Sequence, residues 1–278
     1  MYEAMASSFV GQKTCAGTVS IDGYGQASII GAAWNKHGHL ATRTEVVSEQ
    51  SARFVQPHMK SRSYFGSACS NGVYDYQEYM ALQLLDHSLS FKVDLSGAGC
   101  GCNVAFYLVS LRQNREASQC QDYYCDANEV CGVACAEIDI MEANQKAFVS
   151  TLHAAEDKVG KGAGYGNARA DFSSIDFGVG GTCIDTSSPF TVTASFPLDD
   201  AGLLRAMEVT LTQVDSPCDI TFEVGKYSMF GRDKMPVLTR ALFDGMTPVI
   251  SYWGQHENMQ WLDGKGADGK GPCKTETP

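Results

Sequence analysis

The feature that most constrains the fold is a repeated two-residue alternation of apolar and polar side chains, interrupted by Gly, Ser, Asp and Asn. Such segments are rich in β-branched or aromatic residues, which is typical of short strands. They lie at residues 17–22, 89–95, 103–111, 136–142, 190–196, 206–213, 219–225, 248–253 and 258–263. Many short strands separated by turns predict an all-β chain folded as a two-sheet sandwich.

Helical patterning is scarce. Residues 235–245 are expected to form a short helix that ends at Gly245, and a turn of helix within residues 78–86 stays open. The Gly- and Lys-rich residues 263–278 are expected to form a loop-like tail. The sequence shows no internal repeat and no segment that indicates a second domain, so residues 1–278 are predicted to form a single domain.

Composition excludes several classes of partner. With 21 basic and 32 acidic residues the net charge is −11, which repels nucleic acid and anionic lipid surfaces. No apolar run reaches the roughly 18 residues of a membrane helix, and residues 1–15 lack the pattern of a signal peptide. The sequence indicates no particular protein partner.

The cysteines favour an oxidising compartment. Eleven cysteines in 278 residues are typical of a secreted, disulfide-bonded protein, so an extracellular location is expected. The odd number leaves at least one thiol free or paired between chains, and the absence of any Asn-x-Ser/Thr sequon weighs against a glycosylated product.

The stretch "AEIDIMEAN", residues 136–144, concentrates negative charge in a predicted strand. Glu137 and Asp139 are two apart and share a face, whereas Glu142 would point to the opposite face of a regular strand. A bulge near Ile140 or Met141 would bring Glu142 round to join them. Three clustered acids cannot all ionise easily, so one is expected to have a raised pKa.

Two readings of these acids stay open. Two carboxyl groups that flank a scissile bond are the catalytic residues of a retaining glycosidase, in which one is the nucleophile and the other is the proton donor. The alternative is a strand whose exposed face is simply acidic. The motif alone does not decide between them.

Longer stretches resemble one known family. "CAEIDIMEAN" (135–144) resembles the C-[SA]-E-[MI]-D-I-W-E-A-N signature of glycoside hydrolase family seven, the cellulases that include cellobiohydrolases and endoglucanases. Roughly residues 75–275 match in consistent order, whereas the region before is aligned only doubtfully. Further similar segments are "LSFKVDLSGAGCGCNVAFYLVSL" (89–111), "YYCDA" (123–127), "GGTCID" (180–185), "FTVTASF" (190–196) and "GMTPVISYWGQHENMQWLDG" (245–264).

The resemblance implies a role for each matching residue. Glu137 matches the family's nucleophile, Asp139 the aspartate that positions it, and Glu142 the acid/base. His153 matches a histidine that supports the acid/base, although the residues around it differ. The implied fold is a curved antiparallel sandwich of the concanavalin A-like jelly-roll type, with an open cleft on its concave face.

The same comparison implies residues that bind substrate. Asn103 and Tyr107 match polar residues that line the glycone side of the cleft, and Asp126 matches a carboxylate of the groove. Trp253 and Trp261 match platforms for sugar stacking on either side of the cleavage point, since indole rings cover the apolar faces of pyranoses. For each tryptophan, core packing is the structural alternative.

Matching cysteines imply disulfides. The family has bridges at the positions of Cys125–Cys135 and Cys100–Cys273, and Cys120–Cys131 could form a further local bridge. A zinc site built from the four cysteines of residues 120–135 is the competing interpretation. It is disfavoured because the spacings do not give two paired knuckles, and no metal is expected.

Several positions depart from the family pattern. Met141 replaces a tryptophan in the motif, Gly178 and Lys270 replace arginines, and only Tyr24 stands near the expected chain-entry platform. Lys270 remains a candidate for substrate binding, although it cannot make bidentate contacts. The chain is also shorter than the tunnel enzymes of the family, which implies an open groove.

The resemblance therefore implies hydrolysis of internal β-1,4-glucosidic bonds in cellulose or related β-glucans, by double displacement and without a cofactor. The partner is then a β-glucan polysaccharide or oligosaccharide. The alternative is a relative that keeps the fold but serves as a non-catalytic carbohydrate-binding or structural subunit.

Overall fold

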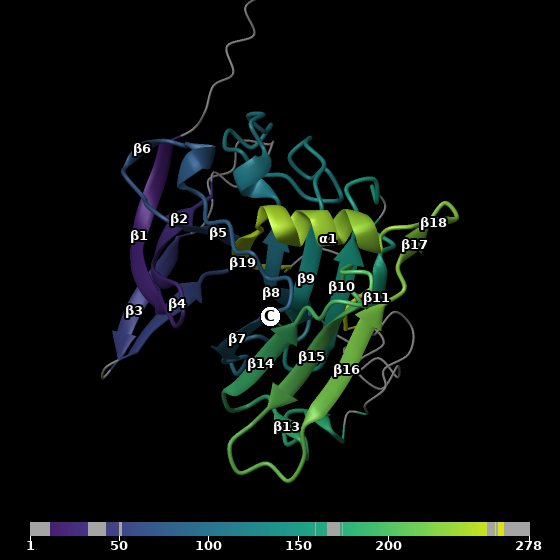
Figure 1. Ribbon diagram of the computed structural model, residues 1–278. Helices are drawn as coiled ribbons and strands as arrows, with labels where there is room; N and C mark the ends of the chain where they lie inside the picture. The colour runs from purple at the N-terminus through teal and green to yellow at the C-terminus, as the bar shows by residue number, and fades with distance from the viewer. Residues whose placement is uncertain are drawn as a thin grey trace, which may run out of the picture.

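The computed structural model describes residues 12–32, 43–49, 52–158, 160–165, 173, 175–254, 259 and 261–263. Within these residues a large antiparallel sheet forms one layer of the molecule (Figure 1). Its strands run from edge to edge in the order β11 (Ala163–Tyr165), β10 (Phe148–His153), β9 (Glu137–Ala143), β8 (Cys102–Val109), β19 (Thr247–Gly254), β5 (Ser61–Gly66), β2 (Gly25–Gly31), β1 (Gln12–Ile21) and β6 (Gly72–Val73).

A smaller antiparallel sheet forms the second layer. Its order is β16 (Ile220–Gly225), β15 (Ala206–Thr212), β14 (Phe190–Ser195) and β7 (Ser88–Val93). Short two-stranded sheets complete the described strands: β3 (Thr44–Glu49) with β4 (Ala52–Pro57), β12 (Phe177–Gly178) with β13 (Ile184–Asp185), and β17 (Ser228–Met229) with β18 (Arg232–Asp233).

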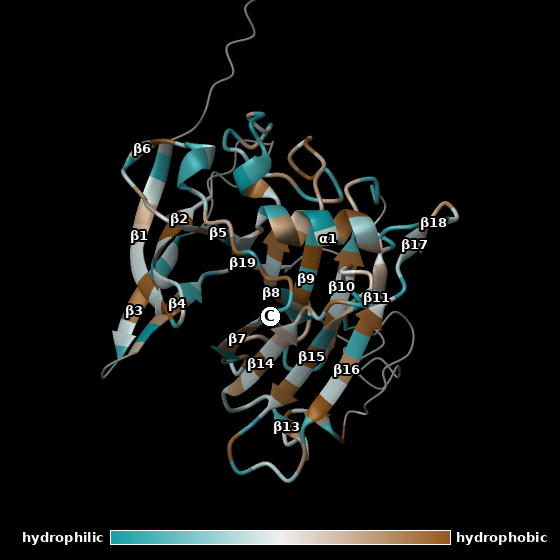
Figure 2. Cartoon of the chain, in the orientation of Figure 1, coloured by the Kyte–Doolittle hydropathy of each residue, from teal (hydrophilic) through white to brown (hydrophobic). Residues whose placement is uncertain are grey.

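The core lies between the two layers. Leu108 and Ile138 of the large sheet pack in one buried cluster with Val192 and Leu211 of the small sheet. Along β14, buried and half-buried residues alternate, and Figure 2 shows the matching bands of brown and paler colour on β14, β15 and β16. One face of the small sheet is therefore apolar and the other is solvated, so the predicted two-sheet antiparallel sandwich is confirmed.

Helical structure is limited to a few turns of the described chain. The helix α1 (Met235–Asp244) forms as predicted and contributes Leu238 and Leu242 to the core. Two 3₁₀ turns, η1 (Tyr76–Glu78) and η2 (Leu111–Gln113), are the other helical elements described. None of the described helices has the length and apolar character needed to cross a membrane.

One local expectation fails, and one possibility that the sequence left open is decided. Residues 259 and 261–263 do not form the strand expected at 258–263; instead the backbone N–H groups of Leu262 and Asp263 both donate to Met259 O, at 2.9 and 3.1 Å, which makes a turn. Its apolar side chains are buried against Ala147, so their alternation reflects core contacts of a loop. After η1, Leu82 pairs with Met246 in an isolated bridge, so residues 79–86 form no helix.

Several strands of the large sheet were not anticipated, and β5 shows why. All six of its residues are buried, including Ser61, Arg62 and Ser63. A strand covered on both faces shows no alternation of apolar and polar residues, and it is normally recognised by a continuous run of apolar residues. The polar residues of β5 interrupt that run, so neither signal of a strand is present.

Disulfides fasten the loops. The expected pairs Cys125–Cys135 and Cys120–Cys131 are bonded, which excludes these four sulfurs as zinc ligands. Two bridges were not anticipated, Cys15–Cys69 and Cys183–Cys218. Cys100 is disulfide-bonded, and its expected partner Cys273 lies outside the described residues. Among the described cysteines, Cys102 is free and buried.

Gly245, which ends α1, offers a test of how tightly the helix meets the rest of the fold. Its φ is +92°, and a Cβ there would lie 2.8 Å from Ala81 Cβ. We expect Gly245→Ala to lower the free energy of unfolding by about 2–4 kcal/mol, because backbone strain and overpacking add. Denaturant unfolding measures the effect.

Gly202→Ala is the matched control, because Gly202 also has a positive φ, +77°, but nothing lies within 4 Å of its added Cβ. This variant should lose only about 1 kcal/mol. Equal losses in the two variants would contradict a steric contribution from Ala81.

Candidate active site

Strand β9 carries one extra residue, Ile140. Asp139 pairs with Tyr107 of β8 and Met141 pairs with Phe106, so Ile140 has no partner of its own on that strand. Ile138, Ile140, Met141 and Ala143 all lie in the sandwich core, whereas Glu137, Asp139 and Glu142 turn to the other face. The bulge that the sequence required is therefore present, and it collects the three acids on one face.

Ser150 of β10 stabilises this bulge. The register between β9 and β10 also shifts here, because Glu142 pairs with Val149 and Asp139 with Thr151. Ser150 lies between these pairs, is buried, and donates from Oγ to Ile140 O at 2.6 Å. The carbonyl group displaced by the extra residue thus keeps a partner in the protein interior.

Glu137 faces the loop that precedes β9. The backbone N–H of Ala127 donates to Glu137 Oε2 at 3.1 Å, and Asp126 of the same loop accepts from Val130 N at 2.9 Å. Burial raises the pKa of Glu137 well above its ordinary value, and the nearby charges of Asp139 and Asp126 raise it further. Burial likewise raises the pKa of Asp126.

His153 connects two carboxylates. Its Nε2 lies 3.2 Å from Asp139 Oδ2, and its Nδ1 lies 2.7 Å from Asp157 Oδ2. Burial alone would lower the pKa of His153, but Asp139, Glu137 and Asp157 raise it to about 10. One ring nitrogen of His153 contacts Asp139 and the other contacts Asp157, so the influence of His153 on Glu142 comes through its charge.

Asp157 is a site residue that sequence analysis missed. It is fully buried, and besides His153 it accepts hydrogen bonds from the backbone N–H groups of Lys161 and Gly162. The spacing of four residues from His153 was the available signal, but β10 ends at His153 and only a turn brings Asp157 back to it.

Glu142 is held by Asn103 of the neighbouring strand β8. Asn103 Nδ2 donates to Glu142 Oε1 at 2.8 Å, and Asn103 is fully buried. Burial, followed by the charge of Asp139, raises the pKa of Glu142 to about 8, although Asn103 and His153 oppose the shift. At neutral pH the site therefore favours a protonated Glu142 beside a cationic His153.

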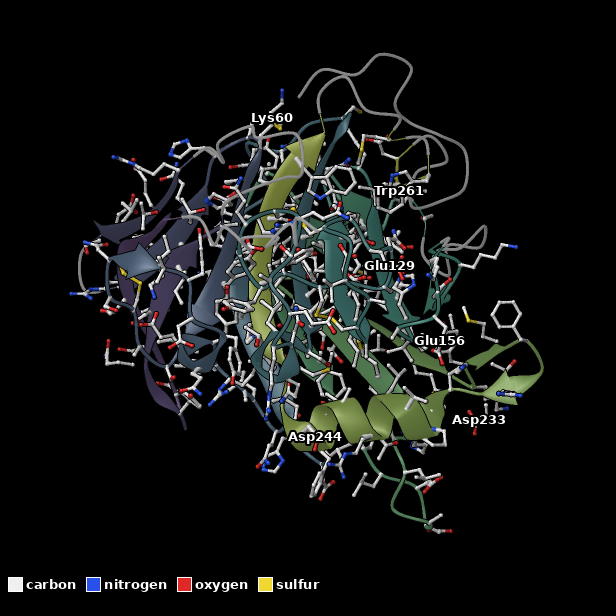
Figure 3. The ribbon with its side chains drawn as sticks, turned by 90° about the horizontal axis from the view of Figure 1, so that it is seen from above. Lys60, Glu129, Glu156, Asp233, Asp244 and Trp261 are labelled. Carbon is white, nitrogen blue, oxygen red and sulfur yellow. A yellow bond between two sulfur atoms is a disulfide. The ribbon has the colours of Figure 1, made fainter. Side chains whose placement is uncertain are left out.

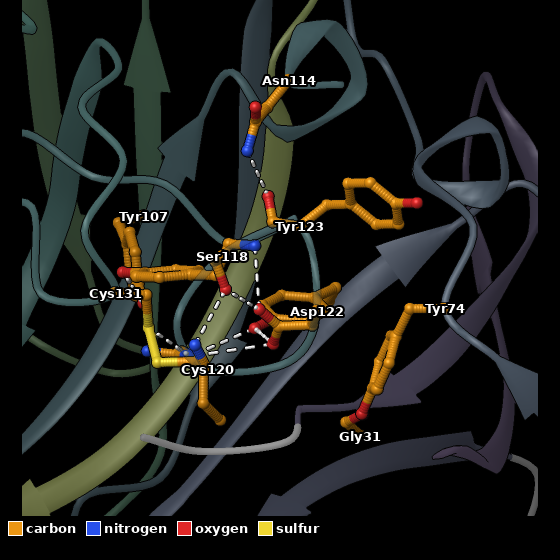
Figure 4. Close-up of polar contacts among 12 residues, drawn as sticks. Gly31, Tyr74, Tyr107, Asn114, Ser118, Cys120, Asp122, Tyr123 and Cys131 are labelled. Atoms are coloured by element: carbon orange, nitrogen blue, oxygen red, sulfur yellow. Dashed lines mark hydrogen bonds and ion pairs between the residues drawn. A yellow bond between two sulfur atoms is a disulfide. The ribbon is translucent and has the colours of Figure 1, made fainter. Parts of the chain in front are cut away.

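A buried polar network anchors the loop beside the acids. Tyr107 and Tyr124 share a hydrogen bond between their hydroxyls at 2.9 Å, and the guanidinium of Arg62 lies 3.5 Å from the centre of the Tyr124 ring. Tyr64 donates to Asp122 Oδ2 at 2.6 Å, and Figure 4 shows Asp122 at the centre of these contacts. The loop 118–135 is thus fixed against β5 and β8. Of the residues in this network, sequence analysis selected Tyr107 but not Arg62, Tyr64, Asp122 or Tyr124.

The two tryptophans contradict one expectation. Trp253 and Trp261 stack on each other, with ring centroids 6.2 Å apart and planes 23° apart, and so do not lie on either side of the acids. Trp253 pairs with Asn103 across β19 and β8, and Trp261 is 47% exposed on the side of the molecule away from α1 (Figure 3). The turn formed by Met259 and Leu262 brings the two rings together.

Asp263 fixes this turn to the sheet. Its Oδ2 accepts from Gly101 N at 2.7 Å and from Asn144 Nδ2 at 2.8 Å, and Asp263 is buried. The structure therefore joins the segment after β19 to the ends of β8 and β9 near Glu142. Lys270, the remaining candidate for substrate binding, lies outside the described residues.

The fold and this cluster of acids define a β-sandwich with a carboxylate site on one face, and comparisons with known proteins show what the chain is similar to. A sequence profile described as glycosyl hydrolase family 7 matches residues 6–128. This match includes the region that sequence motifs aligned only doubtfully, and it ends before Glu137.

Curated relatives agree with the profile. Endoglucanase EG-1 of Hypocrea jecorina is 31% identical over 233 residues, which cover 71% of this chain and 49% of that protein. Endo-beta-1,4-glucanase celB of Emericella nidulans is 29% identical over 331 residues, covering 94% and 74%. The chain thus spans about half the length of the endoglucanase EG-1 relatives it matches.

Among solved structures, the native Humicola insolens endocellulase EGI shares the fold, with a TM-score of 0.61 and 18% identity over 96% of this chain and 90% of that chain. The profile, the relatives and the shared fold agree. The chain is similar to glycosyl hydrolase family 7 over residues 6–128 and to these endoglucanases over most of its length.

The raised pKa of Glu142 implies a stability that depends on pH. The pKa is 4.5 ordinarily and about 8 in the fold, so the unfolded chain loses this proton first as pH rises from 4.5 to 8, and the fold is destabilised over that interval. We expect Glu142→Gln to raise the free energy of unfolding by about 1–3 kcal/mol at pH 8 but not at pH 4.

Denaturant unfolding at several pH values measures this difference. Glu116→Gln is the control, because Glu116 is exposed and its change should have little effect at any pH. A gain for Glu142→Gln that is the same at pH 4 and pH 8 would show that ionisation is not its cause.

Proposed function

We propose that the chain hydrolyses internal β-1,4-glucosidic bonds of cellulose or related β-glucans and retains the configuration of the anomeric carbon. The observation that carries this proposal is the bulge at Ile140, which turns Glu142 to the face of Glu137 and Asp139. A face that brings together two acids, both with raised pKa values, supports double displacement, in which one acid donates a proton and the other attacks. An acidic solvent-facing strand would not be buried in this way.

In the proposed first step, Glu142 protonates the leaving oxygen while Glu137 attacks the anomeric carbon and forms a covalent glycosyl-enzyme. Glu142 then takes a proton from water, and the water displaces Glu137. The Ala127 N–H donates to Glu137 Oε2, which leaves Oε1 to attack. Neither step requires a metal or an organic cofactor.

His153, Asp139 and Asp157 would serve as positioning residues. A cationic His153 held between two carboxylates keeps Asp139 in place beside Glu137. It also offsets the negative charge that the nucleophile must carry, because its charge lowers the pKa of Glu137 against the effect of burial. With three acids and no cation, the site would keep Glu137 protonated, and a protonated Glu137 cannot attack the anomeric carbon.

Substrate contacts are proposed for residues around the acids. The exposed ring of Trp261 offers an apolar face for a pyranose, backed by Trp253. Tyr107 and Asp126 are held by the loop 118–135 beside Glu137, and Asn103 lies beside Glu142. Lys270 is retained as a proposed contact from the family resemblance alone.

The endo mode, the location and the domain organisation are also proposals. The endoglucanases among the relatives support cleavage within a chain. The open cleft is proposed from the family resemblance. The disulfides support an extracellular protein. One core shared by both sheets supports a single domain over residues 1–278.

Glu137→Gln tests the proposed function. We expect a loss of roughly three orders of magnitude or more in the release of reducing sugar from barley β-glucan or carboxymethyl cellulose, because the variant lacks its nucleophile. Proton NMR of the first product should show that the wild type forms the β-anomer.

Glu116→Gln is the matched control and should retain full activity, since this exposed side chain is not part of the site. Circular dichroism checks that the Glu137→Gln variant is folded. Saturable glucan binding by the wild type without any release of sugar would overturn the proposal in favour of a carbohydrate-binding subunit.

A further inference from the structure

Asn103 has a contact that its expected role in sugar binding does not explain. It lies on β8 between Trp253 of β19 and the bulged end of β9, and it is completely buried. Its Nδ2 donates to Glu142 Oε1 at 2.8 Å. Its Oδ1 has no hydrogen-bond partner among the described residues.

Burying an amide with one unpaired end costs free energy. The hydrogen bond from Asn103 Nδ2 to Glu142 Oε1 is therefore the contact that explains why an asparagine stands here. The Glu142 contact is the hydrogen bond that the described structure gives to this side chain. An N–H group can only donate, and Glu142 Oε1 must therefore accept. The proton of the neutral acid is then confined to Oε2.

We propose that Asn103 is a positioning residue that fixes which oxygen of Glu142 carries the transferable proton and that tunes when this proton is lost. The inference rests on the proposed role of Glu142 as acid/base. Without Asn103, Glu142 could rotate and present its proton to the interior of the site, away from the glycosidic oxygen.

The charged groups that face Glu142 are Asp139 on β9 and His153 on β10, and β19 presents the uncharged Trp253. Asp139 favours the protonated acid, whereas His153 and the Asn103 N–H favour the carboxylate. Loss of the Asn103 amide therefore shifts the balance toward the protonated form, and the pKa of Glu142 rises.

Asn103→Leu tests this inference, because leucine has nearly the shape of asparagine and no donor. We expect the pKa of Glu142 to rise by about one pH unit. Carbon NMR of protein labelled at glutamate measures this pKa, and the signal that is missing from Glu142→Gln is assigned to Glu142. The alkaline limb of kcat/KM on β-glucan should move up by the same amount, while its plateau falls about tenfold.

Thr151→Val is the control. Thr151 pairs with Asp139 near the same acids, but its hydroxyl makes no hydrogen bond to Glu142 in the described structure. This variant should leave the pKa of Glu142 unchanged. If Asn103→Leu does not fold, Asn103→Ala carries the same expectation with less steric demand.

The NMR titration needs no turnover, so it separates this inference from the proposed function. A wild-type protein that releases no sugar would refute the function, yet Glu142 would still titrate differently in the Asn103 variants. A folded Asn103 variant with an unchanged pKa of Glu142, or with activity lost equally at every pH, would overturn the positioning role.

Discussion

The bulge at Ile140 determines where the charge of β9 lies. A regular strand would send Glu137 and Glu142 to opposite faces, and one of them would be forced into an apolar core. The extra residue lets Ile140 and Met141 both fill that core. Ser150 compensates for the displaced carbonyl, so the irregularity persists without an unpaired group.

The collected acids are tolerated because of what surrounds them. Burial raises the pKa of Glu137 and Glu142, and ionising all the acids together would be costly. His153 supplies the opposite charge and is itself clamped by Asp157. The site stores unfavourable electrostatic energy at neutral pH, which the packed sandwich must overcome, and such storage is common where function requires perturbed groups.

The loop before β9 shows how a short chain keeps such a site rigid. Two disulfides close this loop, Cys120–Cys131 and Cys125–Cys135. Arg62 and Tyr64 of β5 hold it, because Arg62 stacks on Tyr124 and Tyr64 donates to Asp122. The Ala127 N–H therefore reaches Glu137 from a fixed position. The loop has enough cross-links to do this without a large core of its own.

Sequence by itself determined the sandwich, the four strands of its small sheet, the helix ended by Gly245 and the need for a bulge in β9. Each of these follows from local alternation, turn chemistry or motif spacing, which neighbouring residues encode together, whereas the Cys125–Cys135 disulfide was implied by the family resemblance. Tertiary structure alone decided that Asn103 holds Glu142, that Asp157 holds His153, and that Trp253 and Trp261 stack. These contacts join strands and turns that are brought together only by the pairing of β8 with β9 and β19, and by the turn after β10. Their geometry depends on register and burial, which no local pattern records, and the strand expected at residues 258–263 failed for the same reason.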